Sequence, residues 1–183
     1  MLTHQGTCRL ETDRLILRRF RQGDAEVMFR NWTSDDEVTK YLSWPTHTDV
    51  GSTQMVLDSW IEGYEKDDHY IWAISLRDRE YEPIGSISVV AYDDAVGKME
   101  IGYCIGKAWW HQGIMTEALG AVMAFLFERI GAQRVEACHD PRDPHSGDVM
   151  KKCGMIFEGT FRRSGRNNQG ICDVCWYAAF SEK

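Results

Sequence analysis

Three short segments with β-strand composition follow one another between residues 70 and 105 of this 183-residue chain. They cover residues 70–76, 84–92 and 99–105, are rich in β-branched and aromatic side chains, and are separated by short polar turns. Antiparallel strands can be joined by tight turns, whereas parallel strands need a crossover of a dozen or more residues. The stretch therefore predicts an antiparallel meander, which the rest of the chain has to cover.

Helical patterns flank this meander. Before it, residues 25–32 and 53–64 carry apolar side chains at helical spacing, and Asp24 stands where a helix N-cap is expected. After it, residues 115–130 form the clearest amphipathic helix, which ends at Gly131. The remaining elements are strands at 15–20, 134–139, 156–163 and 172–180, a short helix at 146–153, and a polar loop around 167–170. This order predicts an α/β (α+β) fold with a mixed, mostly antiparallel central sheet flanked by about four helices.

Length and composition limit the class of protein. No repeat or linker divides residues 1–183, so we expect a single domain, the size of which is usually roughly 100–200 residues. Hydrophobic residues make up 43% of the chain, which is enough for a core and argues against a disordered protein. With 21 Lys+Arg against 28 Asp+Glu the formal charge is −7, so we expect no direct nucleic-acid partner.

Compartment and metal content follow from what the sequence lacks. It opens without a basic segment followed by an apolar run, and no apolar run approaches the roughly 18–20 residues that cross a bilayer. Its six cysteines are scattered through apolar segments, as is typical of reduced thiols. We expect a cytoplasmic protein without a membrane partner. No metal site is expected, because Cys172 and Cys175 lie three apart in an alternating strand and face opposite sides.

The stretch from Gly102 to Ala118 is the most informative for function. A strand leads through a turn with Gly113 into the long amphipathic helix. The first N–H groups of a helix have no partner within it and lie at the positive end of its dipole. The amides of residues 111–116 can therefore cradle a phosphate, with Gly113 allowing close approach. A plain strand–turn–helix connection remains the alternative, since neither G-x-G-x-x-G nor a P-loop is present.

Residues 110–118, Trp-His-Gln-Gly-Ile-Met-Thr-Glu-Ala, resemble the acetyl-CoA loop of the GNAT N-acetyltransferases, and most closely the RimJ/RimL type that acetylates ribosomal-protein N-termini. The likeness covers nearly the whole chain. Further segments similar to this subfamily are residues 10–18, 102–103, 143–146, 152–155 and 157–159, and Asp173.

The resemblance implies acetyl-CoA as cosubstrate and assigns residues to it. The pyrophosphate is expected on the amides of His111, Gln112, Gly113, Ile114, Met115 and Thr116. The pantetheine arm is expected beside the strand residues Tyr103, Cys104 and Ile105. Asp143 stands at a further cofactor-contacting position where the family usually has Asn, and a carboxylate cannot donate a hydrogen bond as an amide does.

Acetyl transfer requires a neutral amine, a donor to the thioester oxygen, and a proton or hydrogen bond for the leaving thiolate. By resemblance, Glu100 is the base, directly or through water, and Ser146 is the donor on the thiol side. The alternative for Glu100 is an ordinary polar strand residue, and Ser146 also suits a helix N-cap. The strand amide of Tyr103 or Cys104 is the expected oxyanion donor. Trp44, in the break between the first two helices, is expected to form a wall of the acceptor pocket.

One loop departs from the RimL pattern. Some RimL-like enzymes carry an acidic base where this chain reads Arg162-Arg163-Ser164-Gly165-Arg166. That base is absent here, which adds weight to Glu100. The arginines are interpreted either as contacts to an acidic acceptor or to the 3′-phosphate of the cofactor, or as a solvated hairpin.

The sequence thus predicts direct transfer of an acetyl group from acetyl-CoA to a primary amine, with no covalent enzyme intermediate. The acceptor is either a protein N-terminal α-amine or a small amine such as a polyamine or aminoglycoside. Two other classes stay open: a catalytically weak CoA-binding sensor module, and a redox or metal protein that uses Cys172 and Cys175. The oligomeric state, including a homodimer, is also left open.

Overall fold

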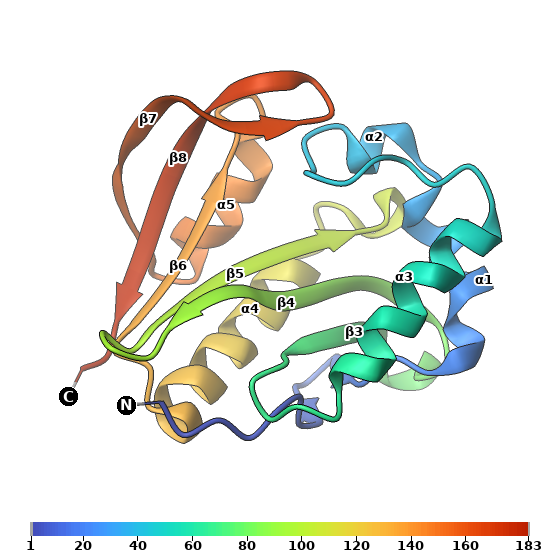
Figure 1. The fold of residues 1–183 in the computed structure, drawn as a ribbon, viewed down its shortest axis with the longest axis horizontal. Coiled ribbons are helices and arrows are strands. Elements are labelled where there is room, and N and C mark those ends of the chain that lie inside the picture. The colour runs from blue at the N-terminus through green and yellow to red at the C-terminus, as the bar shows by residue number, and fades with distance from the viewer. Residues whose placement is uncertain (1, 183) are drawn as a thin grey trace.

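The computed structural model describes residues 2–182 and shows an eight-stranded sheet with helices against both faces (Figure 1). The strands are β1 (Leu10–Glu11), β2 (Leu15–Arg18), β3 (Ile71–Leu76), β4 (Pro83–Asp93), β5 (Lys98–Ile105), β6 (Arg134–His139), β7 (Ile156–Asn167) and β8 (Gly170–Phe180). The helices are α1 (Ala25–Met28), α2 (Asp36–Thr39), α3 (Val50–Gly63), α4 (Ile114–Phe125) and α5 (Pro144–Lys152). Single turns of 3₁₀ or π-helix are η1 (Gln22–Asp24), η2 (Phe29–Thr33), η3 (Arg77–Arg79), η4 (Lys107–Trp109) and η5 (Leu126–Ile130).

The strand order is β1-β2-β3-β4-β5-β6-β8-β7, and each neighbouring pair except β5 with β6 is antiparallel. The predicted mixed, mostly antiparallel sheet is therefore confirmed. A parallel pair cannot be joined by a hairpin, so the chain crosses from β5 to β6 through α4 and η5 behind the sheet.

The predicted elements occur in the predicted order, with β1 and the short helix α2 in addition, and the other differences lie at the ends of elements. The two-residue strand β1 was not predicted. The expected helix of residues 25–32 changes into the π-turn η2 after Met28. Strands β7 and β8 are longer than expected, so the polar loop around 167–170 shrinks to a tight turn at Asn168 and Gln169. Gly131, with φ of 80°, ends the η5 turn as the sequence indicated.

Two apolar clusters hold the layers together. The larger one joins the sheet to α4 and includes Trp72 and Leu119, which are fully buried. The smaller one joins the opposite face of the sheet to α1 and α3 and includes Trp32 and Leu57. Within residues 2–182, no helix covers this second face over β6, β8, β7 and the Glu100 end of β5, whereas Cys104 at the other end of β5 packs against the smaller cluster (Figure 1). The sheet therefore has an open half on the side of α1 and α3.

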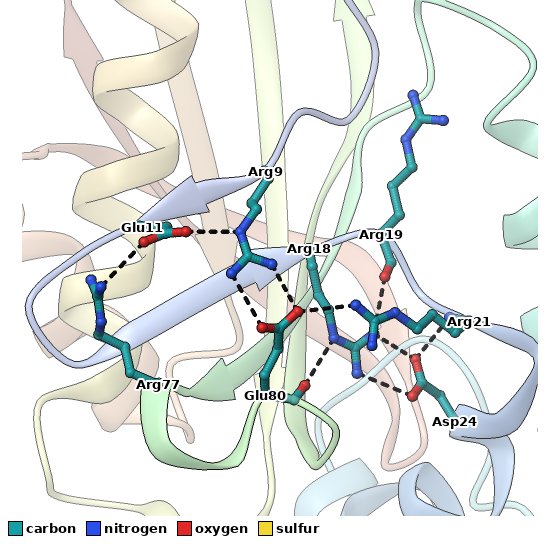
Figure 2. A network of polar contacts seen from close by, with 8 residues as sticks. All are labelled: Arg9, Glu11, Arg18, Arg19, Arg21, Asp24, Arg77 and Glu80. Atoms are coloured by element: carbon teal, nitrogen blue, oxygen red, sulfur yellow. Dashed lines mark hydrogen bonds and ion pairs between the residues drawn. The ribbon is translucent and has the colours of Figure 1, made fainter.

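Asp24 stands at the predicted N-cap position of α1, but its side chain does not cap the helix. Its carboxylate accepts no bond from the amides of α1 and is instead buried against the guanidinium of Arg18, at 2.8 and 3.1 Å. It also accepts a hydrogen bond from the backbone N–H of Arg21. Arg18 in turn donates to the carbonyl of Glu80, whose carboxylate contacts Arg9 and Arg21 (Figure 2). The pair ties β2 to the start of α1, because a buried charge needs a partner of opposite sign.

Replacing Asp24 with Asn keeps the shape of the side chain and leaves Arg18 buried without its counter-charge. We expect Asp24→Asn to lower the free energy of unfolding by about 3–5 kcal/mol, the usual cost of breaking a buried pair from one side. Urea denaturation measures the change. The matched control is Glu82→Gln, which removes a partly exposed carboxylate 3.4 Å from the solvent-exposed Arg30 and should cost less than about 1 kcal/mol. Equal losses in the two variants would contradict the structural role of the Asp24 pair.

Candidate active site

The site is built around the point where β5 and β6 separate. The two strands pair from Lys98 with Arg134 up to Ile101 with Ala137, and no further. Beyond this point β5 continues against β4 as far as Ile105, whereas β6 stays with β8. The edge of β5 from Gly102 to Ile105 thus faces a gap with no strand partner on that side. Main-chain N–H and C=O groups on such an edge are available to a ligand.

The N-terminus of α4 opens into the same region. Gly113 occupies its N-cap with φ of 72°, and no side chain caps the first turn. His111 also has a positive φ, of 60°, so the chain turns sharply just before the helix. Glu117 in the first turn holds the loop from behind, because it accepts bonds from Thr12 and Arg14 while Arg14 donates to the carbonyl of Gln112. The first amides of α4 are left for an anion.

A cleft of about 600 Å³ lies between this loop, the end of β5 and the start of α5. It brings together eleven of the residues that the sequence singled out: Tyr103, Cys104, Ile105, His111, Gln112, Gly113, Ile114, Met115, Thr116, Asp143 and Ser146. Residues far apart in the sequence therefore line one cavity, as the resemblance implied. Glu100 and Trp44 do not line it.

Ser146 is held at the start of α5 by two partners. Its hydroxyl donates to Asp143 Oδ2 at 2.8 Å, and its carbonyl accepts from the Tyr103 hydroxyl at 2.9 Å. The helix begins at Pro144 with Asp143 as its N-cap, so the N-cap reading of Ser146 is wrong. Burial and the nearby Asp143 carboxylate raise the pKa of Tyr103 well above its usual range. Tyr103 thus stays protonated and links β5 to α5.

Glu100 lies on the other side of the sheet. It is one residue before the end of the β5–β6 pairing, directly opposite Glu136, and alternation along β5 separates its side chain from that of Tyr103. The pKa of this half-buried carboxyl is raised, chiefly by desolvation and also by the negative charge of Glu136. The positive charge of Lys98 lowers it in part. Glu136 itself is balanced by Lys98 and Arg134 at 2.9 and 2.7 Å. Glu100 therefore accepts a proton more readily than an exposed carboxylate does.

Trp44 contributes its backbone to a bridge across the top of the molecule. The side-chain amide of Asn168, in the β7–β8 turn, donates to the carbonyls of Thr39 and Trp44 at 2.8 Å each. The backbone N–H of Asn168 donates to the carbonyl of Leu42. The indole of Trp44 packs in the smaller apolar cluster beside His47. These bonds join two segments that approach each other above β5 (Figure 1).

The bridge between the β7–β8 turn and the segment of Thr39 and Trp44 has a second part around Asp140, which the sequence did not predict. Asp140, almost fully buried, accepts bonds from Arg142 and from the side chain of Asn167, and the Arg142 guanidinium lies over the Tyr41 ring at 5.6 Å. These contacts hold the pKa of Asp140 well below its usual range. The spacing Asp-Pro-Arg gave a weak signal of a local ion pair, but nothing local indicates Asn167 or Tyr41.

The thiols near the site are protonated. Burial raises the pKa of Cys104 and brings that of Cys138 to about 12 and that of Cys153 to about 11. Nucleophilic cysteines have lowered pKa values, so these side chains suit packing rather than attack. Among residues 2–182, no group of three His, Cys, Asp or Glu side chains is placed to hold a metal ion. Over the same residues, none of the helices has the length and hydropathy to cross a membrane.

Known proteins match this chain, some over most of its length and others over a part of it. Residues 14–156 match the family described as acetyltransferase (GNAT) domain. The chain is 30% identical to the uncharacterized N-acetyltransferase p20 of Bacillus licheniformis, over 92% of this chain and 94% of that protein. It is 34% identical to the [ribosomal protein uS5]-alanine N-acetyltransferase of Escherichia coli over 32% of this chain and 30% of that protein.

Solved acetyltransferase structures share the fold of this chain. The solved structure of RimL, a ribosomal L7/L12 α-N-protein acetyltransferase in complex with coenzyme A, aligns with a TM-score of 0.84. That alignment covers 96% of this chain and 99% of RimL at 20% identity, which shows a likeness of fold. With the family match spanning well over half of its residues, the chain belongs to the GNAT acetyltransferases and is an acetyl-CoA-dependent N-acetyltransferase.

Proposed function

We propose that this protein transfers an acetyl group directly from acetyl-CoA to a primary amine, and that the acceptor is the N-terminal α-amine of a polypeptide. The observation that carries the proposal is the gap between β5 and β6, with Glu100 on one face of the sheet and Ser146 on the other. The acceptor amine can then approach from the face of Glu100, and the thiol of the cofactor can leave on the face of Ser146. The polypeptide acceptor is supported by relatives whose names include the uS5-alanine and L7/L12 acetyltransferases.

The cleft fits acetyl-CoA, which supplies an acetyl thioester and a thiol leaving group when bound. The uncapped amides at the start of α4, near Ile114, Met115 and Thr116, provide the donors and the positive dipole end that a pyrophosphate requires. The free edge of β5 at Tyr103 to Ile105 provides main-chain groups for the pantetheine amides. A strand amide of Tyr103 or Cys104 is the donor that we assign to the thioester oxygen.

Glu100 and Ser146 supply the two proton-handling groups. Glu100 takes the proton of the amine, directly or through water, and its raised pKa brings it closer to the neutral range in which a base works best. Ser146 offers its hydroxyl as a hydrogen-bond donor to the leaving sulfur, for which its single proton turns from Asp143 Oδ2 toward the cleft. Direct transfer agrees with the raised pKa values of Cys104 and Cys138, because a protonated thiol is a poor nucleophile.

The function is tested by release of free thiol from acetyl-CoA with a panel of peptides and small amines. We expect turnover on peptides with a free N-terminus and none on the same peptides with an acetylated N-terminus. Turnover on small amines alone would reject the polypeptide acceptor. Binding of acetyl-CoA without turnover on any amine would reject the enzymatic proposal in favour of a CoA-binding module.

Removing the carboxylate of Glu100 should change the pH profile. A base works only when deprotonated, so wild-type kcat should fall as the pH drops through the raised pKa of Glu100. We expect Glu100→Gln to lower kcat at neutral pH by about 100-fold or more and to abolish this acidic limb. Its Kd for acetyl-CoA should stay within about twofold, because Glu100 lies outside the cleft. An unchanged pH profile would remove Glu100 from the mechanism.

The hydroxyl of Ser146 can be tested without losing the helix cap, which Asp143 provides. We expect Ser146→Ala to lower kcat by about tenfold or more with little change in Tm, since a donor to the leaving sulfur is lost. Ser146→Thr keeps a hydroxyl and should recover part of the rate. Steady-state kinetics beside thermal unfolding separate the two effects, and a fully active Ser146→Ala would show that another group assists the thiolate.

Substitutions at Gly113 test the amide cradle. Asn and Asp both tolerate a positive φ and can cap the first turn of α4, but only Asp adds a negative charge where the phosphates are expected. We expect Gly113→Asp to raise the Kd for acetyl-CoA at least tenfold more than Gly113→Asn does. Isothermal titration calorimetry gives both values, and equal affinities would place the phosphates elsewhere.

A further inference from the structure

The arginines of this protein are almost all paired. Of the 14 arginines in the sequence, eleven form hydrogen bonds or ion pairs through their guanidinium groups. Within residues 2–182, the guanidinium groups that make no such contact are those of Arg162, Arg163 and Arg166. These three lie together on β7, exposed, in a protein of net charge −7. Such a concentration of unpaired positive charge is a place for an anion.

The arginines lie in the β7–β8 hairpin, with Arg162 and Arg163 on an exposed bulge and Arg166 in the paired stretch that follows it. Phe161 pairs with Val174 and Gly165 with Cys172, so residues 162–164 bulge out opposite Asp173 alone. The backbone N–H of Arg163 donates to Asp173 Oδ1 at 2.8 Å, and the Ser164 hydroxyl donates to the Phe161 carbonyl at 3.0 Å. We call residues 162–166 the arginine bulge. Its backbone is held in place, so its side chains are presented from a defined position.

The bulge borders the open half of the sheet on which Glu100 lies. Residues paired across neighbouring strands point to the same face. The register therefore carries one face from Glu100 through Glu136 to Ala178, and alternation along β8 carries it on through Trp176 to Val174 and its partner Phe161. An apolar floor thus runs from Glu100 to Phe161, at the edge of the arginine bulge, and no helix covers it among the described residues (Figure 1). Arg166 pairs with Ile171 and starts from the opposite face of the edge strand β7, so its side chain reaches the floor only around that edge.

We propose that the arginine bulge binds acidic side chains of the polypeptide whose N-terminal amine lies at Glu100, so that it selects acceptors with an acidic segment near their N-terminus. This rests on the proposed acetyl transfer to a polypeptide. Three strand spacings of about 4.8 Å and four residues of about 3.3 Å along β8 separate Glu100 from the bulge by about 19 Å. An extended peptide covers that distance in about six residues, which places the acidic side chains at positions 5–7.

Other anions fit this surface less well. The arginine bulge does not line the cleft beside α4, so it is removed from the expected phosphates of the cofactor. A nucleic acid presents a phosphate at every nucleotide and would meet the net charge of −7 with only three free guanidinium groups. An acidic peptide of a few residues matches both the small number of arginines and the apolar floor that leads to them.

The test compares three 12-residue peptides that share their first four residues and carry three Glu, three Gln or three Lys at positions 5–7. At saturating acetyl-CoA and low salt we expect kcat/KM to be about tenfold higher for the Glu peptide than for the Gln peptide, through KM, and this ratio should shrink at high salt. Equal values for the Glu and Gln peptides would overturn the proposal.

Charge reversal gives a result that loss of folding cannot produce. We expect Arg162→Glu/Arg166→Glu, which leaves the left-handed Arg163 in place, to prefer the Lys peptide over the Glu peptide. The matched control Arg30→Glu/Arg79→Glu changes the net charge equally at exposed sites elsewhere and should keep the wild-type preference. A control that inverted the preference equally would reduce the effect to net charge and overturn the assignment.

Other outcomes separate a failure of the acidic-segment proposal from a failure of the proposed acetyl transfer. If wild type acetylates small amines but none of the peptides, the acidic-segment proposal fails while the acetyltransferase activity stands. If a 12-nucleotide RNA inhibits wild type more strongly than the Glu peptide does, and not the reversed variant, the bulge binds nucleic acid and the peptide proposal is overturned. Absence of turnover on every amine would instead reject the function on which the proposal rests.

Discussion

The backbone pairing of β5 with β6 stops at Ile101 and Ala137, and the rest of the site depends on this break. Two parallel neighbours need a crossover, so α4 lies behind the sheet and its N-terminus returns to the place where the strands part. The same separation leaves the edge of β5 without a strand partner. Unpaired backbone groups on β5 and uncapped amides on α4 are thus brought to one cleft by topology rather than by a dense set of charged side chains.

The break also divides the chemistry between two faces. Tyr103 and Ser146 meet on the side of α5, while Glu100 stands with Glu136 on the open side. This arrangement lets desolvation and a neighbouring carboxylate raise the pKa of Glu100 without placing that charge beside the anionic cofactor. An acidic protein can bind acetyl-CoA because helix-end amides act locally, whereas the net charge acts over a screened distance.

The β7–β8 hairpin serves both faces. At its tip, Asn168 holds the segment of Thr39 and Trp44, and Asn167 joins Asp140 and Arg142. Farther down β7, the arginine bulge borders the open face. One hairpin therefore bridges the top of the cleft and carries the three arginines beside the open half of the sheet. A polar turn and a basic stretch that looked separate in the sequence belong to one element.

Local signals predicted the order of elements and the Gly113 turn, whereas the resemblance supplied the set of residues that line the cleft. They did so because strand alternation, helical spacing and a glycine at positive φ depend on neighbouring residues. They were incomplete at Asp24, which stands at the N-cap position of α1 but pairs its carboxylate with Arg18. The alternative of Ser146 as an N-cap is wrong, because Asp143 caps α5. Both capping interpretations were locally sound, and a more distant or competing partner decided the outcome.

The sequence by itself determined which segments become strands and helices, and through the resemblance which family they form. Only the tertiary structure decided that Glu100 and Ser146 lie on opposite faces of one gap and that Asn168 bridges to Trp44. It alone also decided that the guanidinium groups of three arginines have no partner among residues 2–182. The physical reason is that strand register and the packing of distant segments depend on pairings between residues far apart in the chain. No local pattern encodes these pairings, because each is chosen among all the surfaces that the folded chain brings together.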